Sequence, residues 1–92
     1  MMELKTTTQF RKDYKRCRKR GLNMKLLQDV IDTLLAGEPL QEKHRDHDLV
    51  GRYTGFRECH VQPDWFLIYR IDNDMLILTA ARTGTHSDLL GM

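Results

Sequence analysis

The sequence predicts an α+β fold, in which a small antiparallel sheet of about four strands carries an N-terminal two-helix hairpin on one face. Two stretches between residues 8 and 36 repeat apolar residues at helical spacing, and three β-rich runs separated by turn residues fill the last third of the chain. A short β-rich stretch precedes the first helix. The expected order is β-α-α-β-β-β, followed by a short C-terminal helical turn.

The length and composition fit one domain over residues 1–92. A chain of 92 residues with 40% hydrophobic and 30% charged residues is ordinary for a soluble protein with one core. No apolar run approaches the roughly 20 residues that span a bilayer, and the N-terminal stretch lacks the apolar segment of a signal peptide. We therefore expect a cytoplasmic protein with no membrane partner. Cys17 and Cys59 lack metal-ligand spacing and are expected to be reduced, buried thiols.

The first half predicts a strand and two helices. The strand is LKTT at residues 4–7, and Thr7 or Thr8 can cap the helix that follows. Gly21 and Asn23 end that helix, and a second runs from about residue 24 to residue 36. Apolar residues repeat on one face of each helix: Phe10, Tyr14 and Cys17 in the first, and Leu27, Val30, Ile31, Leu34 and Leu35 in the second.

The second half predicts consecutive antiparallel strands after a long polar connection, QEKHRDHDLVGRYTG, at residues 41–55. The strands are FRECHV at 56–61, WFLIYRI at 65–71 and MLILTAAR at 75–82, joined by turns at QPD and DND. Because the run 65–71 is almost wholly apolar, it should be a central strand covered on both faces. Strict alternation would put Leu76, Leu78, Ala80 and Arg82 on one face of the last strand.

The charge is distributed unevenly along the chain. Residues 1–25 contain nine Lys or Arg and two acidic residues, a net charge of +7, whereas residues 26–92 have a net charge of −5. Seven of the ten residues in RKDYKRCRKR, at 11–20, are cationic. Such a block is either a solvated helix face or a surface for a polyanion such as RNA, and both can hold. The RNA contacts expected here are Lys15, Arg16 and Lys19.

Polar side chains at the ends of the predicted strands can form a site. If the last three strands are adjacent, one sheet edge brings together His60, Asp64, Trp65, Arg82 and His86, and the loop histidines His44 and His47 can reach them. Taken singly, each has an ordinary structural role as a turn, core or surface residue. Together they suit RNA cleavage, in which the 2′-hydroxyl loses a proton, the phosphorane is held and the leaving 5′-oxygen gains a proton.

In that interpretation Arg82 and Thr83 contact the RNA backbone and Trp65 offers a flat surface to a base. No metal or other cofactor is needed, because the 2′-hydroxyl is the internal nucleophile. The competing use of the histidines is a zinc site at HRDH, residues 44–47, but that stretch has no cysteine nearby and no second ligand pair.

The segments HDLVGRYTGFRECHVQPDWFLIYRI and RTGTHSDLLG carry a family resemblance. They resemble the YafQ-like toxins of the RelE/ParE superfamily, and the strand and basic helical hairpin of the first half match the same RelE-like layout. The most specific parts are HVQPDW, RTGTH and the histidine of DHDL. The resemblance covers nearly the whole chain.

The resemblance implies an endonuclease that cleaves mRNA in the ribosomal A site and is neutralised by a separately encoded antitoxin. The family's reactive residues fall on His47, His60, Asp64 and His86, with Trp65 and Arg82 also in place. One departure is Leu90, where YafQ-like toxins have a phenylalanine that helps to hold the codon. Two alternatives remain open: a ParE-like inhibitor of DNA gyrase, and a non-catalytic basic RNA-binding module.

Overall fold

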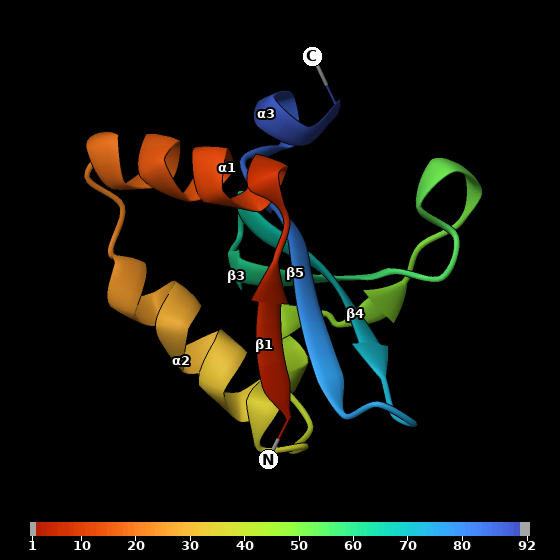
Figure 1. Ribbon diagram of the computed structural model, residues 1–92. Helices are drawn as coiled ribbons and strands as arrows, with labels where there is room; N and C mark the ends of the chain where they lie inside the picture. The colour runs from red at the N-terminus through yellow and green to blue at the C-terminus, as the bar shows by residue number, and fades with distance from the viewer. Residues whose placement is uncertain (1, 91–92) are drawn as a thin grey trace.

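The computed structural model describes residues 2–90, except for the side chain of Leu90. Figure 1 shows the chain as a twisted sheet with two long helices near the N-terminus and a short one at the C-terminal end. The elements are β1 (Glu3–Thr6), α1 (Thr8–Lys19), α2 (Met24–Leu35), η1 (Glu42–His44), β2 (His47–Asp48), η2 (Gly51–Tyr53), β3 (Arg57–Gln62), β4 (Trp65–Asp72), β5 (Ile77–Gly84) and α3 (His86–Leu90).

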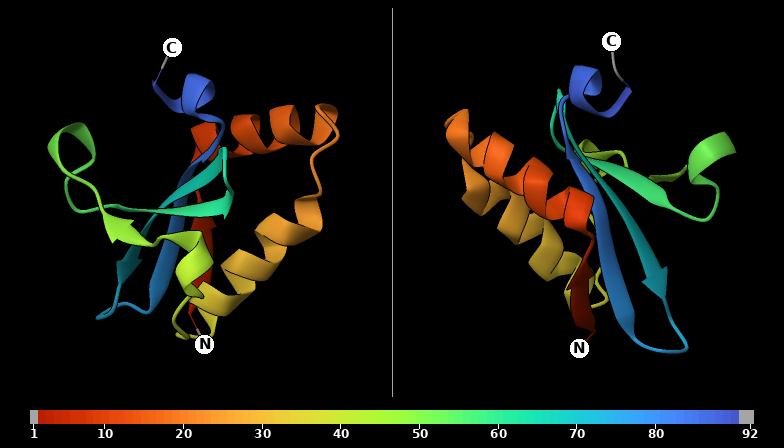
Figure 2. Two further views of the ribbon diagram at one scale, coloured as in Figure 1. Left: turned by 180° about the vertical axis from the view of Figure 1, so that it is seen from behind. Right: turned by 45° about the horizontal axis from the view of Figure 1, so that its top comes forward.

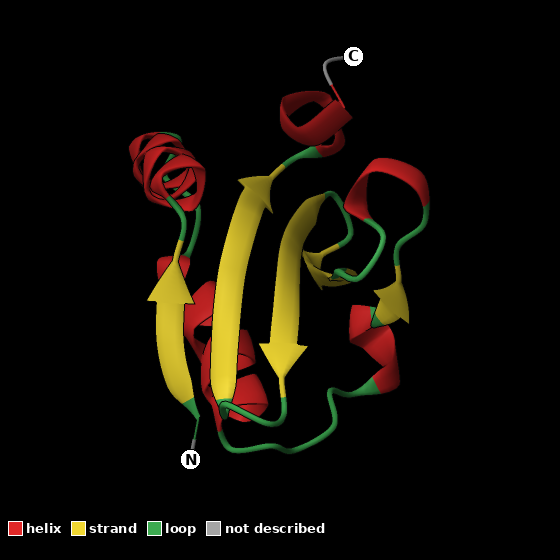
Figure 3. Ribbon diagram, turned by 45° about the vertical axis from the view of Figure 1, so that its right-hand side comes forward, coloured by secondary structure: helices red, strands yellow, loops and turns green. Residues whose placement is uncertain are grey.

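The sheet has five strands in the order β1-β5-β4-β3-β2. The β3, β4 and β5 strands form the consecutive antiparallel hairpins that the sequence predicts. The sheet is mixed rather than wholly antiparallel, because β1 pairs with β5 in the same direction, as the adjacent arrows in Figure 3 show. The additional strand, β2, has only two residues and pairs with β3. The α+β class and the order of the main elements are confirmed.

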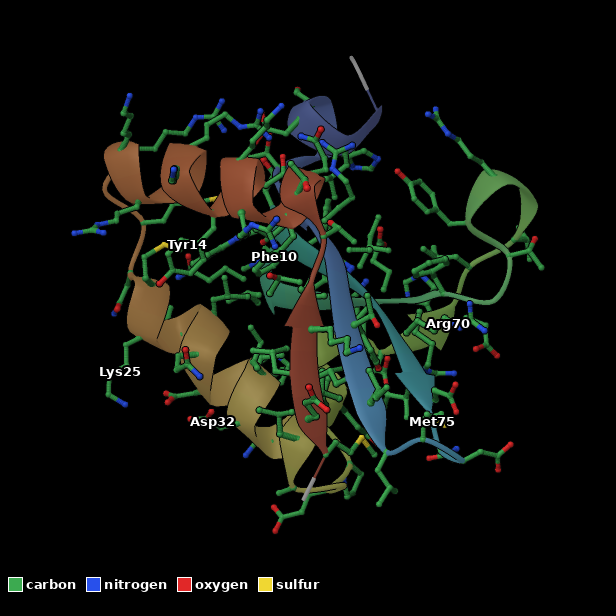
Figure 4. All side chains as sticks on the ribbon, viewed as in Figure 1. Phe10, Tyr14, Lys25, Asp32, Arg70 and Met75 are labelled. Carbon is green, nitrogen blue, oxygen red and sulfur yellow. The ribbon has the colours of Figure 1, made fainter. Side chains whose placement is uncertain are left out.

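Local capping places the two helices where the sequence predicts them. The Oγ1 atom of Thr7 accepts a hydrogen bond from the backbone N–H of Phe10 at 2.9 Å, and Asn23 accepts one from Lys25 at 3.2 Å. Both helices lie on the same side of the sheet (Figure 2). In Figure 4, Phe10 lies on the inner side of α1, whereas Lys25 and Asp32 point outward from α2.

The core lies between these helices and one face of the sheet. Its members include Phe10 and Cys17 from α1, together with Leu27, Val30, Ile31, Leu34, Cys59, Val61, Trp65, Leu67, Tyr69, Leu78 and Ala80. Both cysteines are free and buried, as expected. Burial raises the pKa of the Cys59 thiol to about 12, which keeps it protonated and unreactive at neutral pH. No helix within residues 2–90 is long and apolar enough to cross a membrane.

A β-bulge in β5 reverses the direction of its last side chains. Tyr69 pairs with Ala80, but the preceding residue, Ile68, pairs with Arg82, so Ala81 is an extra residue in β5. Arg82 therefore lies on the sheet face opposite Ala80. The alternation that placed it on the same face is wrong, since one inserted residue inverts a period of two. The central strand β4 is buried continuously from Trp65 to Tyr69, as its composition predicts.

Candidate active site

The candidate site lies on the sheet face that does not pack against α1 and α2. We call this the distal face and define it by Glu58, His60, Phe66, Ile68 and Arg82. The strand register forms one row across it, in which His47 pairs with Glu58, Glu58 with Ile68, and Ile68 with Arg82. The next row contains His60, Phe66 and Gly84. Strands β2, β3 and β5 thus contribute polar side chains to one surface, and β4 contributes the apolar Phe66 and Ile68.

Phe66 contacts two imidazole rings. Its ring centroid is 4.6 Å from that of His60 and 5.4 Å from that of His86, and both contacts are edge-on, with interplanar angles of 80° and 86°. The two imidazoles are therefore at most about 10 Å apart, the sum of the two ring separations. Phe66 itself is only 6% exposed, so it provides a fixed spacer for two titratable groups. His60 is half-buried and His86 is exposed.

Hydrogen bonds at the start of α3 determine where His86 lies. Asp64, in the turn between β3 and β4, accepts a hydrogen bond from the backbone N–H of His86 at 3.3 Å. Thr85 and Asp88 cap the helix reciprocally: the N–H of Asp88 donates to Thr85 Oγ1, and the N–H of Thr85 donates to Asp88 Oδ2. The turns at the ends of β3 and β5 are thus joined, as the sequence predicts.

Ion pairs connect α3 to the end of α1. Asp88 accepts two hydrogen bonds from Arg20, at 2.5 and 3.0 Å. The hydrogen bond from Arg20 holds the pKa of Asp88 down to about 2. Gly84 lets the Asp88 side chain pack against the end of β5, because a Cβ atom at position 84 would lie 2.9 Å from the Cβ of Asp88. The φ of Gly84, +154°, also favours glycine.

Arg82 is held by a buried carboxylate. Asp13 in α1 is fully buried and accepts hydrogen bonds from Arg82 Nε at 2.7 Å and from Arg82 Nη2 at 3.3 Å. The same carboxylate accepts the backbone N–H of Thr83 at 3.2 Å. Its hydrogen bond to Arg82 raises the pKa of that guanidinium above its ordinary value. A hydrogen bond with Tyr53 raises the same pKa, and the Arg82 side chain remains 19% exposed.

The loop histidines His44 and His47 are each held by a hydrogen bond to a backbone oxygen. His47 donates from Nδ1 to the carbonyl oxygen of Arg45 at 2.7 Å, and its Nε2 lies 3.6 Å from the Glu58 carboxylate. Its side chain is 48% exposed and shares the row of Glu58 and Arg82. His44 donates from Nδ1 to the carbonyl oxygen of His60 at 2.6 Å. Both histidines of the HRDH stretch thus use Nδ1 on backbone oxygens. In the part of the chain that the structure describes, no three His, Cys, Asp or Glu side chains form a metal-binding group.

Trp65 and Thr83, two of the predicted RNA contacts, are buried in this structure. Trp65 is 2% exposed in the core and donates from Nε1 to Thr83 Oγ1 at 2.9 Å, and Thr83 is fully buried and donates in turn to the carbonyl of Phe66. Both side chains are satisfied by partners within the protein. Trp65 follows the turn directly and points inward because it belongs to the core face of β4, where its large apolar ring gains most from burial.

Part of the basic block of α1 forms ion pairs with carboxylates of the protein itself. Arg16 donates to Asp13 at 2.8 Å and lies 3.7 Å from Asp88, so most of its charge is compensated. Its predicted contact with RNA would have to compete with these two ion pairs. Lys15 and Lys19 are exposed and remain available to a polyanion. The departure at Leu90 concerns a side chain outside the described residues.

The sequence did not single out Phe66, Glu58 or Asp13 as site residues. Phe66 and Glu58 could have been found from the alternation that brings them onto the face of His60, once the strand pairing is known. Asp13 carries one signal, because an acidic residue within a run of basic residues on a helix is an expected internal partner. Its contact with Arg82 depends on the tertiary fold alone.

The chemistry of this surface is that of proton transfer next to an anion. The imidazoles of His60 and His86 both contact Phe66, and the guanidinium of Arg82 is held at the edge of the distal face. The carboxylates of Asp64 and Glu58 lie next to these groups. Such a set can accept one proton, donate another and stabilise a negatively charged intermediate.

Comparison with known proteins identifies similar chains over the full length. Residues 2–91 match the family model described as the bacterial toxin of type II toxin–antitoxin system, YafQ. The mRNA interferase toxin YafQ of Escherichia coli K12 is 37% identical over 90 residues, which is 97% of this chain and 96% of that protein. The crystal structure of YafQ from E. coli BL21(DE3) has a TM-score of 0.91 and 35% identity, covering 99% of this chain and 100% of that one. In the E. coli DinJ–YafQ complex the matched chain has a TM-score of 0.90 and 36% identity, with the same coverage of both chains.

Proposed function

This chain belongs to the YafQ family of bacterial type II toxin–antitoxin toxins, and on that premise we propose that it is an mRNA interferase that cleaves mRNA on the ribosome. The observation that carries the proposal is the pair of imidazoles of His60 and His86, which both contact Phe66 on the face that carries Arg82. A toxin that only bound RNA would not need two proton-transfer groups at this spacing.

The proposed reaction is a transesterification within the RNA. A base removes the proton of a ribose 2′-hydroxyl, whose oxygen attacks the adjacent phosphorus, and an acid donates a proton to the departing 5′-oxygen. The products are a 2′,3′-cyclic phosphate and a free 5′-hydroxyl. Since the nucleophile is part of the substrate, the chemistry needs no metal-activated water.

His86 is the proposed acid and His60 the proposed base. His86 is exposed at the start of α3, where a leaving group can approach it, and its backbone is held by Asp64. His60 is half-buried on β3, and its ring is held by the edge contact with Phe66. Asp64 is the alternative base, because its carboxylate lies in the turn that follows β3 and contacts the backbone of His86. His47 is assigned to positioning the substrate from the neighbouring row.

Arg82 is proposed to stabilise the phosphorane. The buried Asp13 orients the guanidinium through its Nε and Nη2, so that the positive charge is held at the edge of the distal face. A cation held in advance in this way loses little conformational entropy when negative charge develops. The cost of burying Asp13 is offset by the hydrogen bonds that it accepts from Arg16, Arg82 and Thr83.

Ribosome dependence is proposed from the charge distribution and from the family. The exposed Lys15 and Lys19 extend a basic surface along α1, close to the site through the Arg20–Asp88 ion pair. Such a surface suits ribosomal RNA phosphates. A cognate antitoxin is the other expected partner, because the similar E. coli toxin has been crystallised as a DinJ–YafQ complex.

The test is to incubate translating ribosomes with the purified chain and to map new 5′ ends on the mRNA. New ends within the A-site codon, bearing 5′-hydroxyls, are the expected result. Binding to ribosomes without new ends would instead favour the non-catalytic RNA-binding module. Cleavage of free mRNA at the same rate would remove the ribosome from the proposal.

A further inference from the structure

A groove on the distal face adjoins Arg82 and is not used by the proposed acid and base. It has a volume of about 530 Å³ and lies between the loop at 49–53 and α3. Figure 1 shows the loop that carries η2 standing away from the sheet. The groove is lined by Leu49, Val50, Arg52, Tyr53, Glu58, Ile68, Asp88 and Leu89.

The floor of the groove lies between a carboxylate and a guanidinium. Ile68 is 3% exposed, and its register partners on the two sides are Glu58 in β3 and Arg82 in β5. At the usual strand separation, Glu58 and Arg82 are about 10 Å apart across this apolar floor. A nucleotide has the same sequence of groups, with an anionic phosphate, an apolar planar ring and a polar outer edge.

The walls of the groove suit a flat ring. Leu49, Tyr53 and Leu89 are half-buried and contribute apolar surface. The Tyr53 ring is held in place, because Phe56 packs edge-on at 6.1 Å and the Arg52 guanidinium lies 5.9 Å from its centroid. An aromatic ring held in this way provides a stacking surface, which is the role that the buried Trp65 cannot fill.

We propose that this groove binds one nucleobase of the mRNA codon, with Tyr53 as its stacking surface and Glu58 as the residue that recognises the base edge. The inference rests on the proposed function, since it assigns a subsite next to the same phosphate-binding Arg82. The nucleotide's phosphate lies at Arg82, its base stacks on Tyr53, and its Watson–Crick edge meets the carboxylate of Glu58.

The chemistry of Glu58 determines which bases fit. A carboxylate accepts hydrogen bonds and donates none. Guanine presents two adjacent N–H donors on its Watson–Crick edge, and adenine and cytosine each present an amino group. Uracil presents one N–H between two carbonyl oxygens, which the carboxylate repels. The groove therefore favours amino-bearing bases, with guanine first and uracil last.

The experiment measures cleavage on stalled ribosomes whose A-site codons differ at one position at a time, for the wild type, Glu58→Gln, Tyr53→Ala and Asp32→Asn. At one codon position the wild type should cleave the guanine codon roughly 5- to 100-fold faster than the uracil codon, the discrimination expected of a good hydrogen-bond pair to a base edge. Glu58→Gln should reduce that ratio to about 2 or less, because the amide both donates and accepts. Tyr53→Ala should slow all codons by a similar factor. Asp32, an exposed carboxylate on α2, is the matched control and should leave the profile unchanged.

A second measurement does not depend on the ribosome. Guanosine and uridine monophosphate are titrated separately into the isotope-labelled protein, and amide shifts are followed by NMR. Larger shifts at Leu49, Tyr53 and Leu89 with the guanine nucleotide support the inference. If the wild type cleaves but Glu58→Gln keeps the wild-type codon profile, the groove is not a base site and the proposed function stands. If the wild type cleaves nothing, the function and this inference fall together.

Discussion

The buried carboxylate of Asp13 in α1 accepts a hydrogen bond at 2.7 Å from Nε of Arg82 in β5, a residue 69 positions later in the chain. This contact joins the N-terminal helix to the strand that ends at the candidate active site. It makes α1 part of the site's framework as well as part of a basic surface. Replacing Asp13 should therefore change both stability and catalysis.

Asp13→Asn is expected to lower the free energy of unfolding by about 3 kcal/mol, because two guanidinium groups lose their buried counter-ion. Urea denaturation measures this against Asp32→Asn, an exposed carboxylate whose loss should cost almost nothing. Below the unfolding transition, kcat should fall about 10-fold or more while ribosome binding is kept, since Arg82 loses its orientation and keeps its charge. A parallel loss of kcat and binding would show that Asp13 serves folding alone.

His86→Gln should leave the melting temperature unchanged, because the side chain is exposed. Cleavage should fall by roughly 10²-fold or more, the usual contribution of a general acid. Near wild-type cleavage by His86→Gln removes this residue from the mechanism.

Trp65→Phe tests whether the indole ring of Trp65 contacts RNA. The variant loses the hydrogen bond from Nε1 to Thr83, so the free energy of unfolding should fall by about 1 kcal/mol. Ribosome affinity should not change, since the ring is 2% exposed. If the variant is as stable as the wild type but binds ribosomes more weakly, the Trp65 ring contacts RNA.

The basic block separates into two functional groups. Lys15→Glu with Lys19→Glu should weaken ribosome association, and wild-type association should fall steeply with added salt, because counterion release drives binding to phosphates. Arg16→Glu should mainly destabilise the fold, since Arg16 faces the carboxylates of Asp13 and Asp88. Sedimentation with ribosomes and thermal melting distinguish the two effects. Binding that is independent of salt would mean that the lysines form only a solvated face.

Acid stability tests the link between α1 and α3. The pKa of Asp88 is about 2 in the folded protein, below its ordinary value of 3.8. A carboxyl group whose folded pKa is depressed contributes stability that is present above about pH 4 and is lost as the pH falls toward 2. Asp88→Asn should therefore be less stable than the wild type at pH 7, and the difference should shrink below pH 4. A constant difference across this range would exclude the ionised pair as its cause.

The sequence alone determined the secondary structure and the family. Caps at Thr7 and Asn23, the apolar faces of two helices and the apolar run of β4 are local patterns, so they are legible without the fold. The motifs HVQPDW and RTGTH likewise carried the family resemblance directly.

Only the tertiary structure decided how the site is built. One extra residue at Ala81 turned Arg82 onto the face of Ile68, and no composition signals such a bulge. Core packing buried Trp65, and the position of α3 turned Arg16 and Arg20 toward Asp88. These outcomes depend on contacts between residues far apart in the chain. Periodicity reports which face a residue prefers, whereas the partner on that face is set by the whole fold.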